Sequence, residues 1–192
     1  MEQLIALDTR LFLFLNGLHS PFWDTVMWYI SGTKTWIPLY VVIIFFIFFE
    51  YKKRGFLPLI FIILVILLAD KISVYGFKFV FERFRPTHNP EIADLVHIVR
   101  DYRGGKYGFV SSHAANTFGL ASFTSLLFAN KKYTWFIYIW AAVVSYSRIY
   151  LGVHYPGDIL GGAILGWLIG YLVFMGYEWV SDRFIKKAGQ SG

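Results

Sequence analysis

The chain has 192 residues, of which 57% are hydrophobic and 21% aromatic, whereas only 16% are charged. A water-soluble domain carries about 25% charged residues, so this composition excludes an ordinary soluble protein and predicts a single membrane-embedded domain over residues 1–192. The net charge is +6, and the lack of cysteine excludes disulfides and thiolate chemistry.

The first 32 residues are expected to lie at the membrane surface. Residues 3–17 are weakly amphipathic, and the stretch HSPFWDTVMWYIS contains Trp23, Trp28 and Tyr29, aromatic residues that favour the membrane–water interface. We therefore predict interfacial helices over residues 1–32, with a sixth, poorly marked span as the alternative. Neither a basic start nor a small-residue cleavage site is present, so no cleavable signal peptide is expected.

Five apolar segments are candidate spans, because crossing ~30 Å of hydrocarbon takes about 20 helical residues. They are residues 36–49, 56–81, 114–129, 133–150 and 159–179. The predicted fold is all-α, a polytopic membrane helix bundle of five to six spans with an N-terminal interfacial helix. Segment 114–129 is rich in small residues and is expected inside the bundle. Gly162, Gly166 and Gly170 recur at four-residue spacing, which lets a neighbouring helix approach closely.

The basic residues fall on two sides of this bundle. Eight of the eighteen Lys and Arg follow the first, third and fifth segments, which the positive-inside rule assigns to the cytoplasm. Seven more fall on the opposite side: Lys78, Arg83, Arg85, Arg100, Arg103, Lys106 and Arg148. A solvated loop that binds anionic headgroups accounts for the three at positions 100–106. Lys78, Arg85 and Arg148 lie at or near helix ends, so we expect them to bind a polyanion, with phosphate the leading candidate.

Two of the segments that face outward resemble parts of an anion site. In KFVFERFRP, Lys78 precedes Arg85 by seven residues, which on a continuous helix places both cations on one face. Glu82 lies between them and is expected to pair with either. In GFVSSHAANT, residues 111 and 112 are expected to open a helix, where free backbone N–H groups and the helix dipole favour an anion. His113 falls in the first turn of that helix.

The third segment, SRIYLGVHYPGD, places Arg148 at the end of one helix, His154 in the connection and Asp158 at the start of the next. Alone, Asp158 is most simply a helix N-cap. Together the three segments supply the parts of metal-free phosphoryl transfer. Cations and backbone amides hold the phosphate oxygens, one imidazole attacks phosphorus, a carboxylate orients it, and a second imidazole protonates the leaving oxygen.

These residues resemble the signature of the type 2 phosphatidic acid phosphatase superfamily, which is related to the vanadium-dependent haloperoxidases. Its first motif, Lys-x6-Arg-Pro, is matched by Lys78, Arg85 and Pro86, and its third, Ser-Arg-x5-His-x3-Asp, by Ser147, Arg148, His154 and Asp158. The second motif is Pro-Ser-Gly-His. The chain keeps Ser111 and His113 there but has Val110 for the proline and Ser112 for the glycine, a change that could bring the Ser112 hydroxyl near the phosphate.

The resemblance implies a role for each residue. His154 is expected to be the nucleophile that forms a phosphohistidine, Asp158 to hold its other ring nitrogen, and His113 to act as the general acid. The implied phosphate ligands are Lys78, Arg85, Ser111, Ser112 and Arg148, helped by backbone N–H groups of residues 112 and 113. No metal and no other cofactor is expected.

The implied substrate is a membrane lipid phosphate that arrives laterally from the outer leaflet. We expect a bacterial cytoplasmic (inner) membrane protein with its site facing the periplasm, under an outward loop of residues 86–110. Undecaprenyl diphosphate is the first choice. A lipid A phosphatase is the alternative, followed by a phosphatase of phosphatidylglycerol phosphate or phosphatidate. The bilayer and the lipid are the expected partners, with no nucleic acid and no obligate protein partner.

Two readings from other classes stay open at this point. One is a non-catalytic protein that binds or transports a lipid phosphate, and the other is a vanadate-dependent peroxidase, which the five apolar segments disfavour because those relatives are soluble. His88 and His97 are expected at the surface or the rim of the site, and His19 at the interface. Lys71 is expected to extend the cationic lining, to snorkel, or to form a structural pair.

Overall fold

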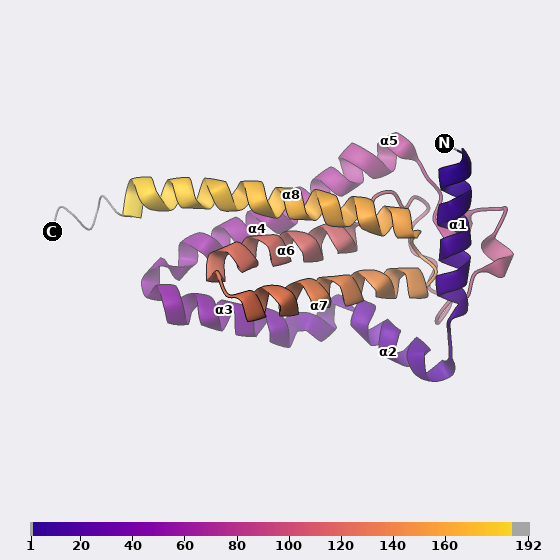
Figure 1. The fold of residues 1–192 in the computed structure, drawn as a ribbon, viewed down its shortest axis with the longest axis horizontal. Helices are drawn as coiled ribbons and strands as arrows, with labels where there is room; N and C mark the ends of the chain where they lie inside the picture. Colours follow the sequence, from indigo (N-terminus) through magenta and orange to yellow (C-terminus); the bar gives the residue numbers. More distant parts are fainter. Residues whose placement is uncertain (1, 186–192) are drawn as a thin grey trace.

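The long helices of the computed structural model, which describes residues 2–185, run along one axis (Figure 1). They are α3 (Ile37–Tyr51), α4 (Phe56–Lys71), α6 (Ser112–Phe128), α7 (Lys131–Tyr150) and α8 (Pro156–Val180). α4 continues through a π-helical turn, Ile72–Lys78, into the short α5 (Phe79–Phe81). Successive helices alternate in direction, and no β-strand occurs within residues 2–185, so the all-α prediction is confirmed.

The N-terminal helix α1 (Glu2–Gly17) lies across one end of the bundle, and α2 (Pro21–Ser31) leads from it towards α3 (Figure 1). α2 begins where the Ser20 hydroxyl accepts a hydrogen bond from the Trp23 backbone N–H, with Pro21 in the first turn. Large apolar side chains of α1, among them Leu4, Leu7 and Phe14, are exposed. Placement of α1 and α2 at a membrane interface stays a prediction.

Helix α6 lies at the centre of the bundle, as its small residues predicted. Most of its side chains are buried, and α8 packs against it through glycine. A Cβ atom added at Gly162, Gly166 or Gly170 would overlap the backbone of α6 or of its N-cap, so the expected close approach is confirmed. The starts of α6 and α8 are thereby held side by side at the α1 end.

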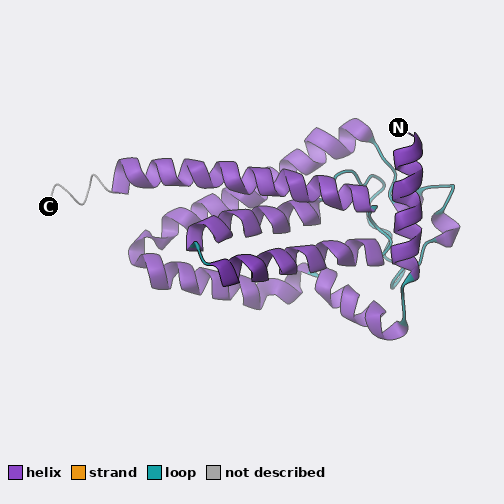
Figure 2. Cartoon of the chain, in the orientation of Figure 1, coloured by secondary structure: helices purple, strands orange, loops and turns teal. Residues whose placement is uncertain are grey.

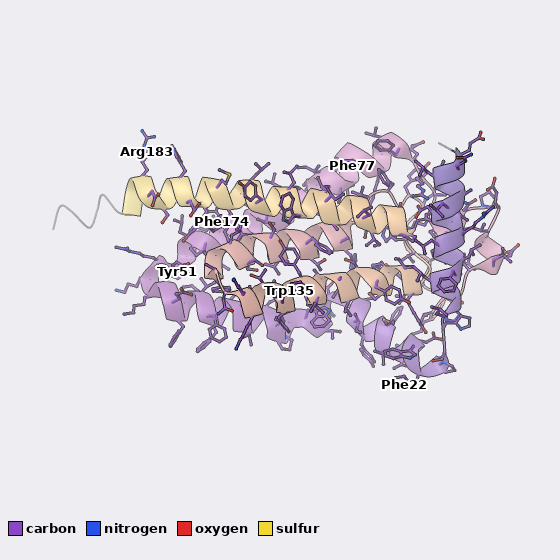
Figure 3. The ribbon with its side chains drawn as sticks, viewed as in Figure 1. Phe22, Tyr51, Phe77, Trp135, Phe174 and Arg183 are labelled. Atoms are coloured by element: carbon purple, nitrogen blue, oxygen red, sulfur yellow. The ribbon has the colours of Figure 1, made fainter. Side chains whose placement is uncertain are left out.

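The outer surface of the bundle is apolar and aromatic. Figure 3 shows side chains such as Phe22 and Trp135 projecting outward, and both are largely exposed. Two helical stretches within the described residues are long and apolar enough to cross a membrane, Thr33–Phe81 and Pro156–Arg183. The first of these reverses direction at the turn Lys52–Gly55, between α3 and α4. Five to six spans remain a prediction.

The longer loops gather at the α1 end of the bundle (Figure 2). The segment between α5 and α6 is anchored there by Asn16 of α1, whose amide donates to backbone carbonyls of His97, Ile149 and Tyr150. The Asn16 side chain also accepts the His97 backbone N–H, at 2.8 Å. One buried amide therefore joins α1, the loop and the end of α7.

The sequence did not identify the partners of His19, His88 and His97. His97 Nε2 lies 2.9 Å from Asp24 Oδ1, and its ring stacks on that of His19 with centroids 3.7 Å apart. The His97 side chain is 21% exposed, so it lies partly at the surface, as expected, and also joins the outward loop to α2. His88 Nδ1 lies 3.1 Å from the Thr87 hydroxyl.

The Lys71 side chain is exposed, and its Nζ lies over the Tyr75 ring, 5.4 Å from the centroid.

Candidate active site

The start of α6 is bonded to the end of the second apolar segment. Lys78 Nζ donates to Ser112 Oγ at 2.7 Å, and Ser73 Oγ lies 2.7 Å from the same atom. Ser111 is fully buried and is the N-cap of α6, because its hydroxyl accepts a hydrogen bond from the Ala114 N–H. The hydroxyl of Ser112 thus lies in direct contact with a cation that the sequence assigned to phosphate binding.

Arg85 reaches the site by a different route from the predicted one. The helix that carries Lys78 ends at Phe81, Glu82 adopts a left-handed conformation (φ 45°), and the chain then runs extended to pair Phe84 with Tyr107. Lys78 and Arg85 are therefore not on one helical face, because the helix does not continue to Arg85. Within residues 2–185 no ion pair includes Glu82, contrary to expectation.

The Arg85 guanidinium is buried and faces His154. Its Nε donates to the Tyr107 carbonyl at 3.1 Å, and its Nη1 lies 3.3 Å from the Val153 carbonyl and 3.2 Å from His154 Nε2. Burial, followed by repulsion from the Arg148 guanidinium, lowers the pKa of Arg85. An arginine stays protonated even so, and a bound anion would relieve this repulsion.

His154 and Asp158 form a buried pair at the start of α8. His154 Nδ1 lies 3.3 Å from Asp158 Oδ2, and the backbone N–H of Tyr155 donates to the same oxygen at 3.1 Å. Tyr155 is the N-cap and Asp158 the third helical residue, so Asp158 closes a capping box and is not itself the N-cap. With a proton on Nδ1 directed at the carboxylate, Nε2 keeps its lone pair, which accepts the hydrogen bond from Arg85 Nη1 at 3.2 Å.

His154 is held as a neutral imidazole. Burial is the largest cause that lowers its pKa well below the ordinary value, and the charges of Arg85, Arg148, Lys78 and His113 act in the same direction. Of these four groups, Arg85 is the one that contacts the ring directly, at 3.2 Å from Nε2. A neutral imidazole with an oriented lone pair is the form that attacks phosphorus.

Arg148, at the end of α7, is held by two neutral hydroxyls. Its Nη1 donates to the Ser31 hydroxyl and its Nη2 to the Tyr102 hydroxyl at 3.1 Å. Burial opposes ionisation of Tyr102, but the charge and hydrogen bond of Arg148 lower the pKa of Tyr102 overall. Arg148 Nε is buried and has no partner within the described residues. Within the described residues, Arg148 makes no hydrogen bond to the other predicted site residues, although its charge acts on Arg85 and His154.

His113, in the first turn of α6, lines a cavity of about 310 Å³ between α3, α4, α6 and α7. Polar residues share this lining, among them Ser31 at the end of α2, Thr33, and Asn116 in the second turn of α6. The rest of the wall is largely apolar and includes Ile43, Ile44, Leu59, Ile62, Ile66 and Val144. The cavity therefore runs from the level of the site into the apolar part of the bundle.

Sequence reasoning missed four residues around the site. Arg83 lies 3.0 Å from Asp158 and 2.7 Å from Asp8 of α1, while Ser31 and Tyr102 hold Arg148. The signal for Arg83 was its place among the outward cations, and the signal for Asp8 was its being the acidic residue in the middle of the apolar N-terminal helix. Nothing in the sequence marks Ser31 or Tyr102.

This arrangement is suited to chemistry on a tetrahedral oxyanion. Cations from three segments, Lys78, Arg85 and Arg148, have neutral partners among the described residues, so their charge is available to a ligand. A neutral histidine oriented by a carboxylate lies against Arg85, and a second histidine, His113, lies in the first turn of α6 at the same end of the bundle. Nucleophile, orienting group and charge stabilisation are thus present together.

Comparison with known proteins gives a consistent family. The sequence model of the PAP2 superfamily matches residues 58–182. A lipid A 4'-phosphatase of Porphyromonas gingivalis is 40% identical over 186 residues, which cover 96% of this chain and 79% of that protein. A lipid A 4'-phosphatase of Bacteroides thetaiotaomicron is 44% identical over 177 residues, covering 91% and 78%. An undecaprenyl-diphosphatase of Sulfolobus acidocaldarius is 31% identical over 194 residues, covering 98% and 86%.

A solved structure supports the same assignment. The transmembrane PAP2-type phosphatidylglycerolphosphate phosphatase from Bacillus subtilis superposes with a TM-score of 0.66 at 28% identity, over 96% of this chain and 90% of that one. The similarity to these proteins, in sequence and in fold, therefore covers most of the chain. The chain belongs to the PAP2 superfamily and is a membrane lipid phosphatase of that superfamily.

Proposed function

We propose that the enzyme removes the 4'-phosphate from lipid A, without a metal ion, through a phosphohistidine at His154. Undecaprenyl diphosphate, the first choice from sequence alone, is less well supported than the lipid A alternative. The lipid A 4'-phosphatases are 40% and 44% identical to this chain, against 31% for the undecaprenyl-diphosphatase. The observation that carries the reaction is the neutral His154, held by Asp158 and in contact with Arg85, a cation with neutral partners.

The first half-reaction transfers the phosphoryl group to the enzyme. His154 Nε2 attacks phosphorus, a P–N bond forms, and the P–O bond to the lipid breaks. Burial and the charges of Arg148, Arg85 and Lys78 lower the pKa of His113 to about 3. A bound phosphate dianion offsets those charges and lets His113 take up a proton, which it gives to the leaving lipid oxygen, and the lipid departs as an alcohol. Asp158 stabilises the positive charge that develops on the ring of His154.

The second half-reaction restores the enzyme. His113, now neutral, takes a proton from a water molecule that attacks phosphorus. The P–N bond breaks, inorganic phosphate leaves, and His154 is again a neutral imidazole. Lys78, Arg85 and Arg148 hold the phosphate oxygens in both steps, helped by the hydroxyls of Ser111 and Ser112 and by the backbone N–H groups of residues 112 and 113. These three cations supply the charge stabilisation for which other phosphatases use metal ions.

The cavity beside His113 supports a lipid substrate. It borders the site at His113 and at Ser31, which contacts Arg148, and most of its remaining wall is apolar. Two cavity-lining residues, Asn116 and Trp140, each have a buried polar atom without a partner in the described structure. The acyl chains of lipid A carry carbonyls and hydroxyls that can satisfy such atoms, whereas a polyprenyl chain offers none.

The position of the site supports an outward orientation. His113, His154 and the ends of α5 and α7 lie at the α1 end of the bundle, and the turns at the other end carry Lys52, Lys53, Arg54, Lys131 and Lys132. The positive-inside rule favours a cytoplasmic location for those turns. We therefore place the site at the periplasmic face of the inner membrane, in a bundle of five spans with α1 and α2 at the interface.

The test is phosphate release by the purified enzyme in detergent, with lipid A, undecaprenyl diphosphate and phosphatidylglycerol phosphate as separate substrates. We expect the highest kcat/KM for lipid A, and mass spectrometry should show loss of the phosphate at position 4'. His154→Gln should be inactive on every substrate, with His88→Gln as the matched histidine control that retains activity. Faster hydrolysis of undecaprenyl diphosphate would reject the substrate, and an active His154→Gln enzyme would reject the mechanism.

A further inference from the structure

A chain of ion pairs links the N-terminal helix to the catalytic carboxylate. Asp8 Oδ2 of α1 lies 2.7 Å from Arg83 Nη2, and Arg83 Nη1 lies 3.0 Å from Asp158 Oδ1. The Asp158 side chain is fully buried, whereas those of Asp8 and Arg83 are 16% and 26% exposed. Arg83 is thus the link between a partly hydrated carboxylate and a buried one.

Arg83 differs from the cations assigned to phosphate. Lys78, Arg85 and Arg148 have neutral partners within the described residues, whereas both terminal nitrogens of Arg83 bind carboxylates. Its guanidinium also lies over the Tyr155 ring, 4.0 Å from the centroid, which fixes its plane. A cation whose charge is already compensated by two carboxylates contributes little to the binding of a third anion, so Arg83 is not a phosphate ligand.

The two oxygens of Asp158 have separate partners. Oδ2 faces His154 Nδ1 and accepts the Tyr155 N–H, while Oδ1 accepts from Arg83. The contact at Oδ1 therefore sets the rotation of the carboxylate, and through it the direction of Oδ2 towards the imidazole. Other charged groups whose fields act on Asp158 are Asp8, Arg85 and Lys78.

Asp8 holds this arrangement from outside. Its Oδ2 binds Arg83, and its Oδ1 accepts the backbone N–H of Gly157 at 2.8 Å, one residue before Asp158. The fit is close, since a Cβ atom added at Gly157 would come within 2.8 Å of the Asp8 carboxylate. One side chain of α1 therefore fixes both Arg83 and the first turn of α8.

We propose that Arg83 is a positioning residue that orients Asp158 towards His154, and that Asp8 of α1 holds Arg83 in place. This inference rests on the proposed phosphohistidine reaction, but not on the identity of the lipid. We call the three side chains Asp8, Arg83 and Asp158 the relay. α1 is thereby a functional part of the enzyme, because this helix crosses the end of the bundle and carries Asp8 (Figure 1).

The test is a double-mutant cycle on Asp8→Asn and Arg83→Gln, assayed on the substrate that the wild-type enzyme hydrolyses fastest. We expect Arg83→Gln to lower kcat about tenfold to a hundredfold, the effect of losing one hydrogen bond to a charged group, with KM changed less than threefold. The acid limb of its kcat–pH profile should move to higher pH, since Asp158 loses its cation and stays protonated longer. Asp8→Asn should lower kcat about fivefold alone and have no further effect in the Arg83→Gln background.

Controls separate this inference from the proposed function. Glu2→Gln replaces an exposed carboxylate of the same helix and should retain full activity. Arg83→Lys keeps the charge and should restore the pH profile more than kcat, because lysine lacks the planar fork of the guanidinium.

An Arg83→Gln enzyme with wild-type kcat and pH profile overturns the relay. Effects of the two substitutions that add independently overturn it as well, and so does a change seen only as a lower melting temperature. Should Arg83→Gln fail to fold, the KM–kcat split and pH profile of Asp8→Asn decide. A wild-type enzyme inactive on all lipids, or an active His154→Gln enzyme, rejects the proposed function instead.

Discussion

Arg85 Nη1 lies 3.2 Å from His154 Nε2, while Asp158 holds the other ring nitrogen of the same histidine. The attacking atom therefore faces a buried guanidinium directly. A phosphate that enters must place its oxygens against Arg85 as its phosphorus approaches Nε2. The proposed nucleophile and a proposed phosphate ligand thus lie in contact before substrate binds, an arrangement that would lower a transition-state barrier by preorganisation.

The first prediction concerns the shape of that guanidinium. Arg85→Lys should lower kcat/KM about a hundredfold or more, although the charge is kept, because lysine offers no planar set of donors for two phosphate oxygens. Steady-state kinetics on lipid A measure this. Arg54→Lys, at the opposite end of the bundle, is the control. A kcat/KM within threefold of wild type for Arg85→Lys would mean that only charge matters at this position.

The second prediction separates the two histidines. His113→Gln should lower kcat on a lipid alcohol leaving group by about 10²–10⁴-fold, the usual contribution of a general acid. The loss in the first step should be much smaller for an aryl phosphate, whose leaving group needs no proton. With the aryl phosphate, rapid-quench measurements should show that the phosphoenzyme of His113→Gln accumulates, because His113 is also needed to activate the water that hydrolyses it. Equal losses in phosphoenzyme formation on both substrates would argue against this role.

The third prediction concerns oxyanions and metals. Orthovanadate, which adopts a five-coordinate geometry like that of the transition state, should inhibit competitively and bind more tightly than phosphate. Lys78→Gln should weaken vanadate inhibition because one of the three cations proposed to bind the oxyanion is lost.

Activity should be unchanged after dialysis against EDTA, since Lys78, Arg85 and Arg148 are proposed to provide the positive charge. Loss of activity in EDTA that zinc or magnesium restores would contradict the metal-free reaction.

The fourth prediction concerns substrate selection in the cavity. Trp140→Phe removes an indole N–H that has no partner in the described structure, and should raise KM for lipid A about twofold to tenfold, as expected for one neutral hydrogen bond. KM for undecaprenyl diphosphate should not change. Trp135→Phe is the matched control, because that side chain is exposed on the outer face of the same helix. Equal effects on both lipids would show that the N–H does not distinguish them.

The sequence predicted those features that depend on local patterns. Hydrophobic segments located the long helices, and small residues placed α6 inside the bundle. Residues at helix ends, such as Ser111 and Asp158, were placed near the site because helix ends that face one side of a bundle gather there. Local pattern also misled, since the seven-residue spacing of Lys78 and Arg85 assumed a helix that in fact ends at Phe81.

Long-range partners were beyond such patterns. Asp8 and Arg83 are joined only because α1 crosses the end of the bundle, and helical periodicity carries no information about that crossing. The contacts of Arg148 with Ser31 and Tyr102 depend likewise on how α2 and the outward loop fold back. Single polar residues in apolar or loop segments give no signal of their own until the fold brings them together.

The glycine contact between α6 and α8 has a consequence for redesign. At Gly162, Gly166 and Gly170 the backbone of α8 lies against the backbone of α6 or its N-cap, so these contacts do not involve the outer side chains of α8. Exposed residues such as Leu160, Ile164 and Leu168 of α8 can therefore be replaced by charged ones, as a step towards a water-soluble variant, without changing the glycine contacts that hold the starts of α6 and α8 together.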